Sequence, residues 1–202
     1  MKTILHLNSS IFGDGGQSSR LAEQFVAQFP AAHVVRRDLA KNPLPHLDAE
    51  RFGAFLAKPE GRTAAQQRVL EESDALIAEL KGADTIVIGL PMYNFGIPSQ
   101  LKAYFDHVAR AGVTFKYTDK GAVGLLTGKK AYVFAARGGL YQGTPRDTQT
   151  AYVRDFLAFV GISDVQFVYA EGLAISEASK VESLASAQRV LRNLAQPERI
   201  AA

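Results

Sequence analysis

The sequence predicts a doubly wound α/β domain, in which helices cover both faces of a mostly parallel sheet. Strand and helix patterns alternate five times along the chain, and several strands are apolar at nearly every position. Strands that are buried on both faces read as continuous apolar runs, and such strands are typical of parallel sheets. The chain has 202 residues and shows no repeats or low-complexity tracts, so we expect residues 1–202 to form a single domain.

The elements follow from apolar periodicity and from residues that break helices. The candidate strands are Thr3–Asn8, His33–Arg37, Thr85–Leu90, Lys130–Ala136 and Asp164–Ala170. The candidate helices are Gln17–Gln28, Thr63–Leu80, Pro98–Ala111, Asp147–Val160 and Glu177–Leu194. Gly112 and Gly161 follow two of these helices and are expected to end them.

Two segments interrupt the alternation. Leu39–Arg62 contains Pro43, Pro45, Pro59 and Gly61, and we expect no regular element there. Gly112–Leu126 is also irregular, with an extended apolar alternation around Phe115 and Tyr117. It is either a surface excursion with a small hairpin, or a wall over a ligand site or a subunit contact.

The loop after the third strand, Pro91–Leu101, carries the strongest functional signal. Tyr93 and Phe95 offer flat apolar surfaces, and Asn94 offers a hydrogen-bond donor and an acceptor. Open α/β sheets bind ligands at the carboxyl ends of their strands. The composition of this loop suits a flavin better than a phosphate group or a metal ion.

The loop after the first strand, residues 9–20, is rich in serine and glycine. Free backbone N–H groups and the helix dipole favour an anion at a helix N-terminus, so this loop suits a phosphate group. It lacks the G-x-G-x-x-G spacing of a dinucleotide fingerprint, and the chain has no P-loop motif. The alternative is an ordinary turn with a helix cap.

The loop after the fourth strand begins with Arg137-Gly138-Gly139, and Tyr141 follows. Paired glycines let the backbone approach a ligand closely. Because the loops after strands one, three and four open on the same edge of a doubly wound sheet, we expect them to form one site. Tyr141 is a candidate substrate-facing donor, or else an aromatic side chain that covers the core.

The helix Asp147–Val160 gives a hint of a protein partner. Its core face contains Val153, Phe156, Leu157 and Val160. Tyr152 and Phe159 lie on a flank of that face, which favours a subunit interface or a cofactor wall. The alternative is a broad apolar stripe buried within one chain.

Composition excludes several classes of function. The net charge of +3 comes without a dense basic stripe, so we expect no nucleic-acid partner. The chain contains no cysteine, and its four histidines lack metal-ligand spacing, so we expect no metal site. We see no signal peptide and no apolar stretch long enough for a membrane span, and therefore expect a cytoplasmic protein.

Four segments together resemble the FMN-dependent NADH-azoreductase family, which groups with the NAD(P)H:quinone oxidoreductases. They are Met92-Tyr93-Asn94-Phe95, residues 101–106, residues 110–115 and Arg137-Gly138-Gly139. The similarity extends over nearly the whole chain. The resemblance implies a flavodoxin-like fold with strand order 2-1-3-4-5 and one FMN per subunit. It also implies a homodimer with the active sites near the subunit interface.

The resemblance also implies which residues form the site. The cofactor-binding residues would be Ser10, Gly16, Gln17, Ser18, Met92, Tyr93, Asn94, Phe95, Ala136, Arg137, Gly138 and Gly139. The substrate pocket would contain Tyr117, Tyr141 and Phe159. Gly16 and Ala136 stand where the family often has serine, so we expect FMN binding with altered affinity.

The function implied is a two-electron ping-pong oxidoreductase that uses FMN, takes hydride from NADH or NADPH, and reduces quinones and azo compounds. FMN carries the chemistry, so no catalytic side chain is expected. The alternative is a flavodoxin-type electron carrier without direct NAD(P)H turnover. Lys58, Arg62 and Arg137 are candidates for the adenosine 2′ contact, and otherwise solvated charges.

Overall fold

The computed structural model describes the backbone of residues 1–200 and the side chains of residues 1–196. The strands are β1 (Thr3–Asn8), β2 (His33–Asp38), β3 (Thr85–Pro91), β4 (Phe115–Thr118), β5 (Gly121–Gly124), β6 (Lys130–Ala136) and β7 (Asp164–Ala170). The α-helices are α1 (Gln17–Val26), α2 (Ala49–Leu56), α3 (Ala64–Gly82), α4 (Ser99–Val108), α5 (Thr148–Val160) and α6 (Glu177–Ile200). Two short 3-10 helices are η1 (Gly13–Gly15) and η2 (Pro59–Gly61).

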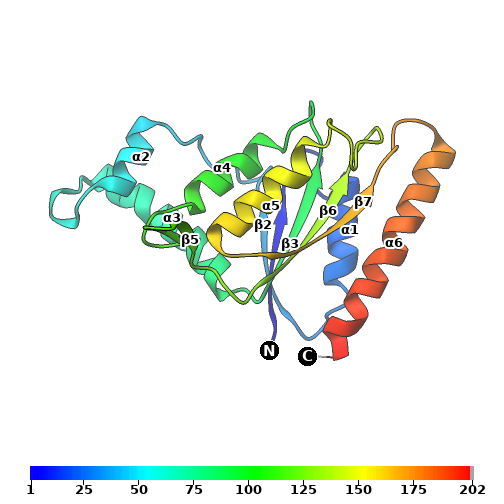
Figure 1. The fold of residues 1–202 in the computed structure, drawn as a ribbon, viewed down its shortest axis with the longest axis horizontal. Coiled ribbons are helices and arrows are strands. Elements are labelled where there is room, and N and C mark those ends of the chain that lie inside the picture. Colours follow the sequence, from blue (N-terminus) through cyan, green and yellow to red (C-terminus); the bar gives the residue numbers. More distant parts are fainter. Residues whose placement is uncertain (201–202) are drawn as a thin grey trace.

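The parallel sheet has the strand order β2-β1-β3-β6-β7 (Figure 1). Since β4 and β5 form a separate antiparallel hairpin, the predicted order 2-1-3-4-5 is confirmed. β3 is buried at every residue, as its apolar sequence predicts. The register pairs Asn8 with Gly89 and Pro91 with Ala136, so the carboxyl ends of β1, β3 and β6 lie side by side.

Helices cover both faces of the sheet (Figure 1). α1 and α6 pack on one face around an aromatic cluster in which the rings of Phe25 and Tyr132 are 4.5 Å apart. α3, α4 and α5 pack on the other face, where Phe105 of α4 stacks on Phe156 of α5 at 3.9 Å. Burial of these two apolar clusters is the main source of stability for a domain of this kind.

Most helix ends agree with the predictions to within a few residues, but α6 continues to Ile200, beyond the predicted Leu194, and one predicted stop is wrong. Gly161 ends α5 in the left-handed conformation, with φ of 107°. Gly112 does not end α4, because the chain already leaves the helix at Ala109. Gly112 instead adopts a positive φ of 78° in the next turn, where its N–H donates to the carbonyl of Phe115.

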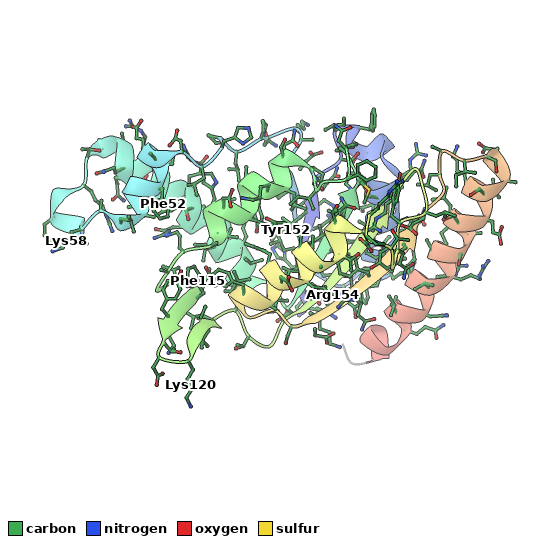
Figure 2. The ribbon with its side chains drawn as sticks, turned by 45° about the horizontal axis from the view of Figure 1, so that its top comes forward. Phe52, Lys58, Phe115, Lys120, Tyr152 and Arg154 are labelled. Atoms are coloured by element: carbon green, nitrogen blue, oxygen red, sulfur yellow. The ribbon has the colours of Figure 1, made fainter. Side chains whose placement is uncertain are left out.

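The segment Leu39–Arg62 contains a helix, which corrects the prediction of no regular element. The Asp48 side chain accepts a hydrogen bond from the Arg51 N–H and caps α2. All the prolines of the segment lie outside α2, so they border the helix without breaking it. We call the segment Leu39–Arg62 the arm. It extends beyond the sheet and its helical layers in Figure 1, and Lys58 lies at its tip in Figure 2.

The hairpin β4–β5 projects near the arm and confirms the predicted small hairpin (Figure 2). Its base packs closely on the end of α5: a Cβ at Gly124 would lie 2.1 Å from the backbone nitrogen of Gly161. Lys120 lies at the free tip (Figure 2). In the described part of the chain, no helix combines the length and the apolar character that crossing a membrane requires.

Candidate functional site

Three loops meet at the carboxyl edge of the sheet, as the sequence predicts. The Tyr93 hydroxyl of the second loop accepts a hydrogen bond from the Ile11 N–H of the first (3.2 Å) and lies 3.4 Å from the Ser10 hydroxyl. The ring of Phe95 packs edge-on against Tyr141 of the third loop, with centroids 5.6 Å apart. The predicted convergence is confirmed, and the binding role of each residue stays a prediction.

Asn8, at the end of β1, fixes the first loop. Its side-chain oxygen accepts hydrogen bonds from the Ser10 N–H (3.2 Å) and the Ser19 hydroxyl (2.6 Å). Its side-chain nitrogen donates to Asp38 at the end of β2 (3.3 Å). Ser9 adds a hydrogen bond to the carbonyl of Gly89 (2.6 Å). The start of the loop is therefore bonded to both neighbouring strands.

The N-terminus of α1 has the properties of a phosphate site. Among the described residues, no side chain caps this end, and the buried Ser18 hydroxyl has no hydrogen-bond partner. The first-turn N–H groups of a helix have no intrahelical acceptor, and the helix dipole attracts anions. An unsatisfied buried polar group costs about 1–3 kcal/mol, and a bound phosphate oxygen would remove that cost. Ser18, together with the predicted Ser10, Gly16 and Gln17, therefore fits a phosphate.

Gly16 is the helix cap residue, and its lack of a side chain has a steric reason. A Cβ at this position would lie 2.2 Å from the Ser10 hydroxyl oxygen and 3.2 Å from that of Ser19. Glycine in place of the family's serine at position 16 therefore agrees with the local packing, because the Ser10 side chain occupies the space that a side chain at position 16 would fill.

The loop after β3 contains a tight turn from Tyr93 to Gly96. The two residues at its ends exchange hydrogen bonds of 3.2 and 2.9 Å between their backbone groups. Asn94 and Phe95 have φ values of 49° and 63°, in the left-handed region that favours glycine. Each such residue costs about 1–2 kcal/mol. Strain of this kind is concentrated at functional sites. Here it places an amide and an aromatic ring at the exposed tip, as a ring-binding loop requires.

The start of α5 holds this turn. The buried Gln149 side chain donates to the carbonyl oxygens of Pro91 and Gly96, both at 2.9 Å. The Thr148 hydroxyl donates to the carbonyl of Phe95. The reasoning from sequence missed both residues. A signal was present for Gln149, because it is polar yet lies in the same helical row as Val153 and Leu157.

Arg137 is not a solvated charge, which corrects that alternative. Its side chain is 1% exposed. It pairs with Asp147 (2.8 Å) and Glu171 (3.0 Å) and donates to Gln149 (3.2 Å). Burial opposes ionisation of Asp147, but hydrogen bonds from Arg137 and Thr150 outweigh it and lower the pKa of this carboxyl group. The guanidinium therefore binds side chains of the protein interior and stabilises the third loop from that side.

The residues next to Arg137 differ in their accessibility. Ala136 is buried at the end of β6, whereas Gly138 is exposed and Gly139 half-buried. A Cβ at Gly139 would lie 2.6 Å from the hydroxyl oxygen of Tyr141, so glycine lets that side chain fold back over the loop. Glu171 accepts hydrogen bonds from the N–H groups of Tyr141 and Gln142, both at 3.0 Å.

Tyr117 and Phe159, predicted for the substrate pocket, lie away from the three loops of their own chain. Phe159 packs on Phe115 of the hairpin, with ring centroids 4.3 Å apart. It is eleven residues along α5 from Thr148, or roughly 16 Å at the usual helical rise. Tyr117 is exposed on β4. Of the other basic candidates, Lys58 is exposed and Arg62 donates to the Ala57 carbonyl at 3.2 Å.

A cavity of about 600 Å³ lies beside α1 at the β2 edge of the sheet. Glu23 in its lining binds Arg36 at 2.8 Å and the Nδ1 of His6 at 3.3 Å. Burial lowers the pKa of His6. Among the described residues, no group of three or more His, Asp or Glu side chains is arranged to hold a metal ion.

Comparison with known proteins identifies the family of the chain. A family model described as flavodoxin-like fold matches residues 2–194. An FMN-dependent NADH:quinone oxidoreductase from Cellvibrio japonicus (strain Ueda107) is 57% identical over 192 residues, covering 93% of this chain and 96% of that protein. The chain belongs to the family of FMN-dependent NADH:quinone oxidoreductases, which has the flavodoxin-like fold. Another FMN-dependent NADH:quinone oxidoreductase, from Burkholderia lata, is 53% identical over 195 residues, covering 95% of this chain and 98% of that protein.

Solved structures of azoreductases share the fold of this quinone oxidoreductase family member. An azoreductase from Bacillus anthracis str. Sterne superposes with a TM-score of 0.88 at 28% identity, covering 96% of this chain and 99% of that one. An FMN-dependent NADH-azoreductase from Bacillus anthracis str. Ames Ancestor, solved in complex with FMN, gives a TM-score of 0.88 at 30% identity, and both chains are covered completely. The family resemblance and the flavodoxin-like fold are confirmed.

Proposed function

We propose that this protein is an FMN-dependent NADH:quinone oxidoreductase that also reduces azo compounds. The observation that carries the proposal is the meeting of two features at one sheet edge. One is the uncapped start of α1 with the unpartnered Ser18 hydroxyl, and the other is the left-handed turn at Asn94 and Phe95. A phosphate group and an aromatic ring system in one molecule match this pair. The names of the relatives agree.

Ser10, Gln17 and Ser18 would hold the FMN phosphate, together with the first-turn N–H groups of α1. Gly16 leaves room for Ser10. Met92 to Phe95 would line the ring, and Asn94 would pair with its polar edge. The backbone N–H groups of Gly138 and Gly139 would donate to the oxygen and nitrogen atoms on which negative charge develops during reduction. Arg137 supports this loop from the protein interior.

Bound FMN supplies two-electron chemistry: it accepts hydride from NADH and returns two electrons to a quinone or an azo compound. The side chains bind, orient and exclude water, and none is required as a nucleophile or general base. Phe95 and Tyr141 border the exposed surface beside the turn. We expect donor and acceptor to bind there in turn, which gives ping-pong kinetics. Because NADH is the donor, the cytoplasm is the expected location.

The site is proposed to be completed by a second copy of this chain. The arm and the hairpin expose large apolar side chains, among them Phe52, Leu56 and Tyr117. In Figure 2 the arm and the hairpin lie at the same end of the molecule, near α5, which carries the half-buried Tyr152. Exposed apolar surface of this kind marks interaction sites. A homodimer would bring Tyr117 and Phe159 to the three loops of its partner, which they do not reach in their own chain.

Anaerobic reduction tests this proposal. The purified protein is reconstituted with FMN, mixed with NADH without oxygen, and then given a quinone. We expect the flavin absorbance to bleach with one equivalent of NADH and to recover on addition of the quinone. A bound flavin that neither NADH nor NADPH reduces would favour an electron carrier instead. A protein that takes up no FMN would contradict both functions.

A further inference from the structure

Gln149 uses every polar atom of its side chain in one buried network. It is 0% exposed, and its amide nitrogen donates to the carbonyls of Pro91 and Gly96. Its amide oxygen accepts from the Nε of Arg137. Because Arg137 has only donors, the amide oxygen must face it, and both amide hydrogens then point at the turn. The orientation of this side chain is therefore fixed by its partners.

The two carbonyls bonded by Gln149 lie on either side of the strained turn. Pro91 ends β3 just before the turn, and Gly96 is its last residue. Between them, Asn94 and Phe95 hold left-handed conformations that other residues than glycine rarely adopt. A turn with two such residues persists only where its surroundings determine it. Gln149 supplies that constraint at both ends.

The same network extends to the third loop. Arg137, which donates to Gln149, also binds Glu171 at 3.0 Å, and Glu171 accepts the N–H groups of Tyr141 and Gln142. A continuous series of hydrogen bonds thus connects the turn after β3 with the loop after β6. Gln149 is the member that joins the two loops.

We propose that Gln149 is a positioning residue for the cofactor: it holds the 93–96 turn in the conformation that presents Asn94 and Phe95 to FMN. This inference rests on the proposed function, since it assumes that FMN occupies the three loops. If the turn is ordered only part of the time, the dissociation constant for FMN rises by the reciprocal of the ordered fraction. Gln149 therefore acts on FMN affinity without touching FMN.

The test compares Gln149→Leu with a matched control, Thr150→Val. The first substitution keeps the size of the side chain and removes both donors to the turn. The control removes the Thr150 hydroxyl, which bonds Arg137, Asp147 and Tyr169 in the same network but has no bond to the turn. Both variants lose hydrogen bonds of the same network, so both are expected to melt at a lower temperature than the parent as apoproteins.

Two readouts separate positioning from general damage. FMN titration followed by flavin fluorescence is expected to give a dissociation constant roughly tenfold higher for Gln149→Leu, and a parental value for Thr150→Val. Hydrogen exchange of the Tyr93 and Gly96 N–H groups in the apoprotein is expected to accelerate only in Gln149→Leu. If both variants bind FMN and exchange alike, the inference is overturned.

A second variant covers the case in which Gln149→Leu does not fold. Gln149→Glu retains the partner of Arg137 as an ion pair, but a carboxylate cannot donate to the two carbonyls, so the same loss of affinity and faster exchange are expected. Failure of the proposed function looks different. In that case the parent protein itself binds no FMN, whereas the exchange comparison still shows whether Gln149 holds the turn.

Discussion

Single atoms decide the shape of the phosphate loop, and position 16 is the clearest case. A methyl group there would meet the Ser10 hydroxyl at 2.2 Å. We expect Gly16→Ala to displace Ser10, lower the free energy of unfolding by about 1–3 kcal/mol, and weaken FMN binding. Gly15→Ala is the control, because a Cβ there meets nothing within 4 Å. Denaturant unfolding and FMN titration measure both effects, and equal behaviour of the two variants would contradict this reading.

His6 makes stability depend on pH. Burial lowers its pKa from the ordinary value of 6.5, although the nearby Glu23 opposes this. At pH well above 6.5 the ring is neutral in both states. As pH falls from 6.5 towards the folded pKa, the unfolded chain binds the proton more readily, so stability decreases. The decrease is at most about 1.4 kcal/mol per pH unit.

Chemical unfolding at several pH values between about 5 and 8 measures this slope. His6→Asn is expected to flatten it, whereas His46→Asn, in an exposed loop, is expected to keep the parental slope. A parental slope in the His6 variant would show that other groups control the acid sensitivity in this range.

The individual site residues were predictable to different degrees. Hydroxyls and glycines before a helix pointed to the loop that contains Gly16 and Ser18, but the family resemblance named these two residues, and their binding role stays a prediction. Gln149 was missed because its partners lie 53 and 58 residues away, and only the fold brings them together. Arg137 was misread as a possible surface charge for the same reason: its two carboxylate partners come from other elements.

At the scale of elements, the strands of the sheet were the most readable part of the fold. Burial on both faces requires apolar residues at consecutive positions, and that requirement leaves a strong sequence pattern. α2 left no such pattern, because it is short and buries little. Residues that are distant in the sequence hold it instead. Arg51 donates to the Nε2 of the buried His107 (3.0 Å) and pairs with Glu72.

The contact of Arg51 predicts how the arm responds to mutation. Arg51→Met removes the bonds to His107 and Glu72 while it keeps an unbranched side chain. We expect hydrogen exchange across residues 49–56 to become about tenfold faster, because local opening of α2 costs less. Lys102→Met, which breaks an exposed pair with Asp106, is the control and is expected to leave the arm unchanged. Unchanged exchange in the Arg51 variant would show that apolar contacts alone hold α2.

For the whole molecule, the projecting arm and hairpin carry exposed apolar side chains, which we propose to contact a partner. A second copy is the proposed partner, and sedimentation is expected to report the mass of two chains. Leu56→Glu combined with Tyr117→Lys places charges on that surface and is expected to give single chains. Val181→Glu is the control. This position is exposed on α6, which covers the other face of the sheet, so the variant is expected to remain a dimer. A parent protein that sediments as one chain would contradict the proposal.

The central claim is that the first loop binds the phosphate of FMN at the start of α1. The most direct measurement is the affinity of the parent and of Ser18→Ala for FMN and for riboflavin, which lacks the phosphate. A hydrogen bond to a charged group contributes about 1.5–3 kcal/mol. We therefore expect Ser18→Ala to bind FMN roughly 10- to 100-fold more weakly than the parent protein does, with an unchanged affinity for riboflavin. If the substitution leaves FMN affinity unchanged, or weakens the binding of both ligands equally, the phosphate does not bind at the proposed site.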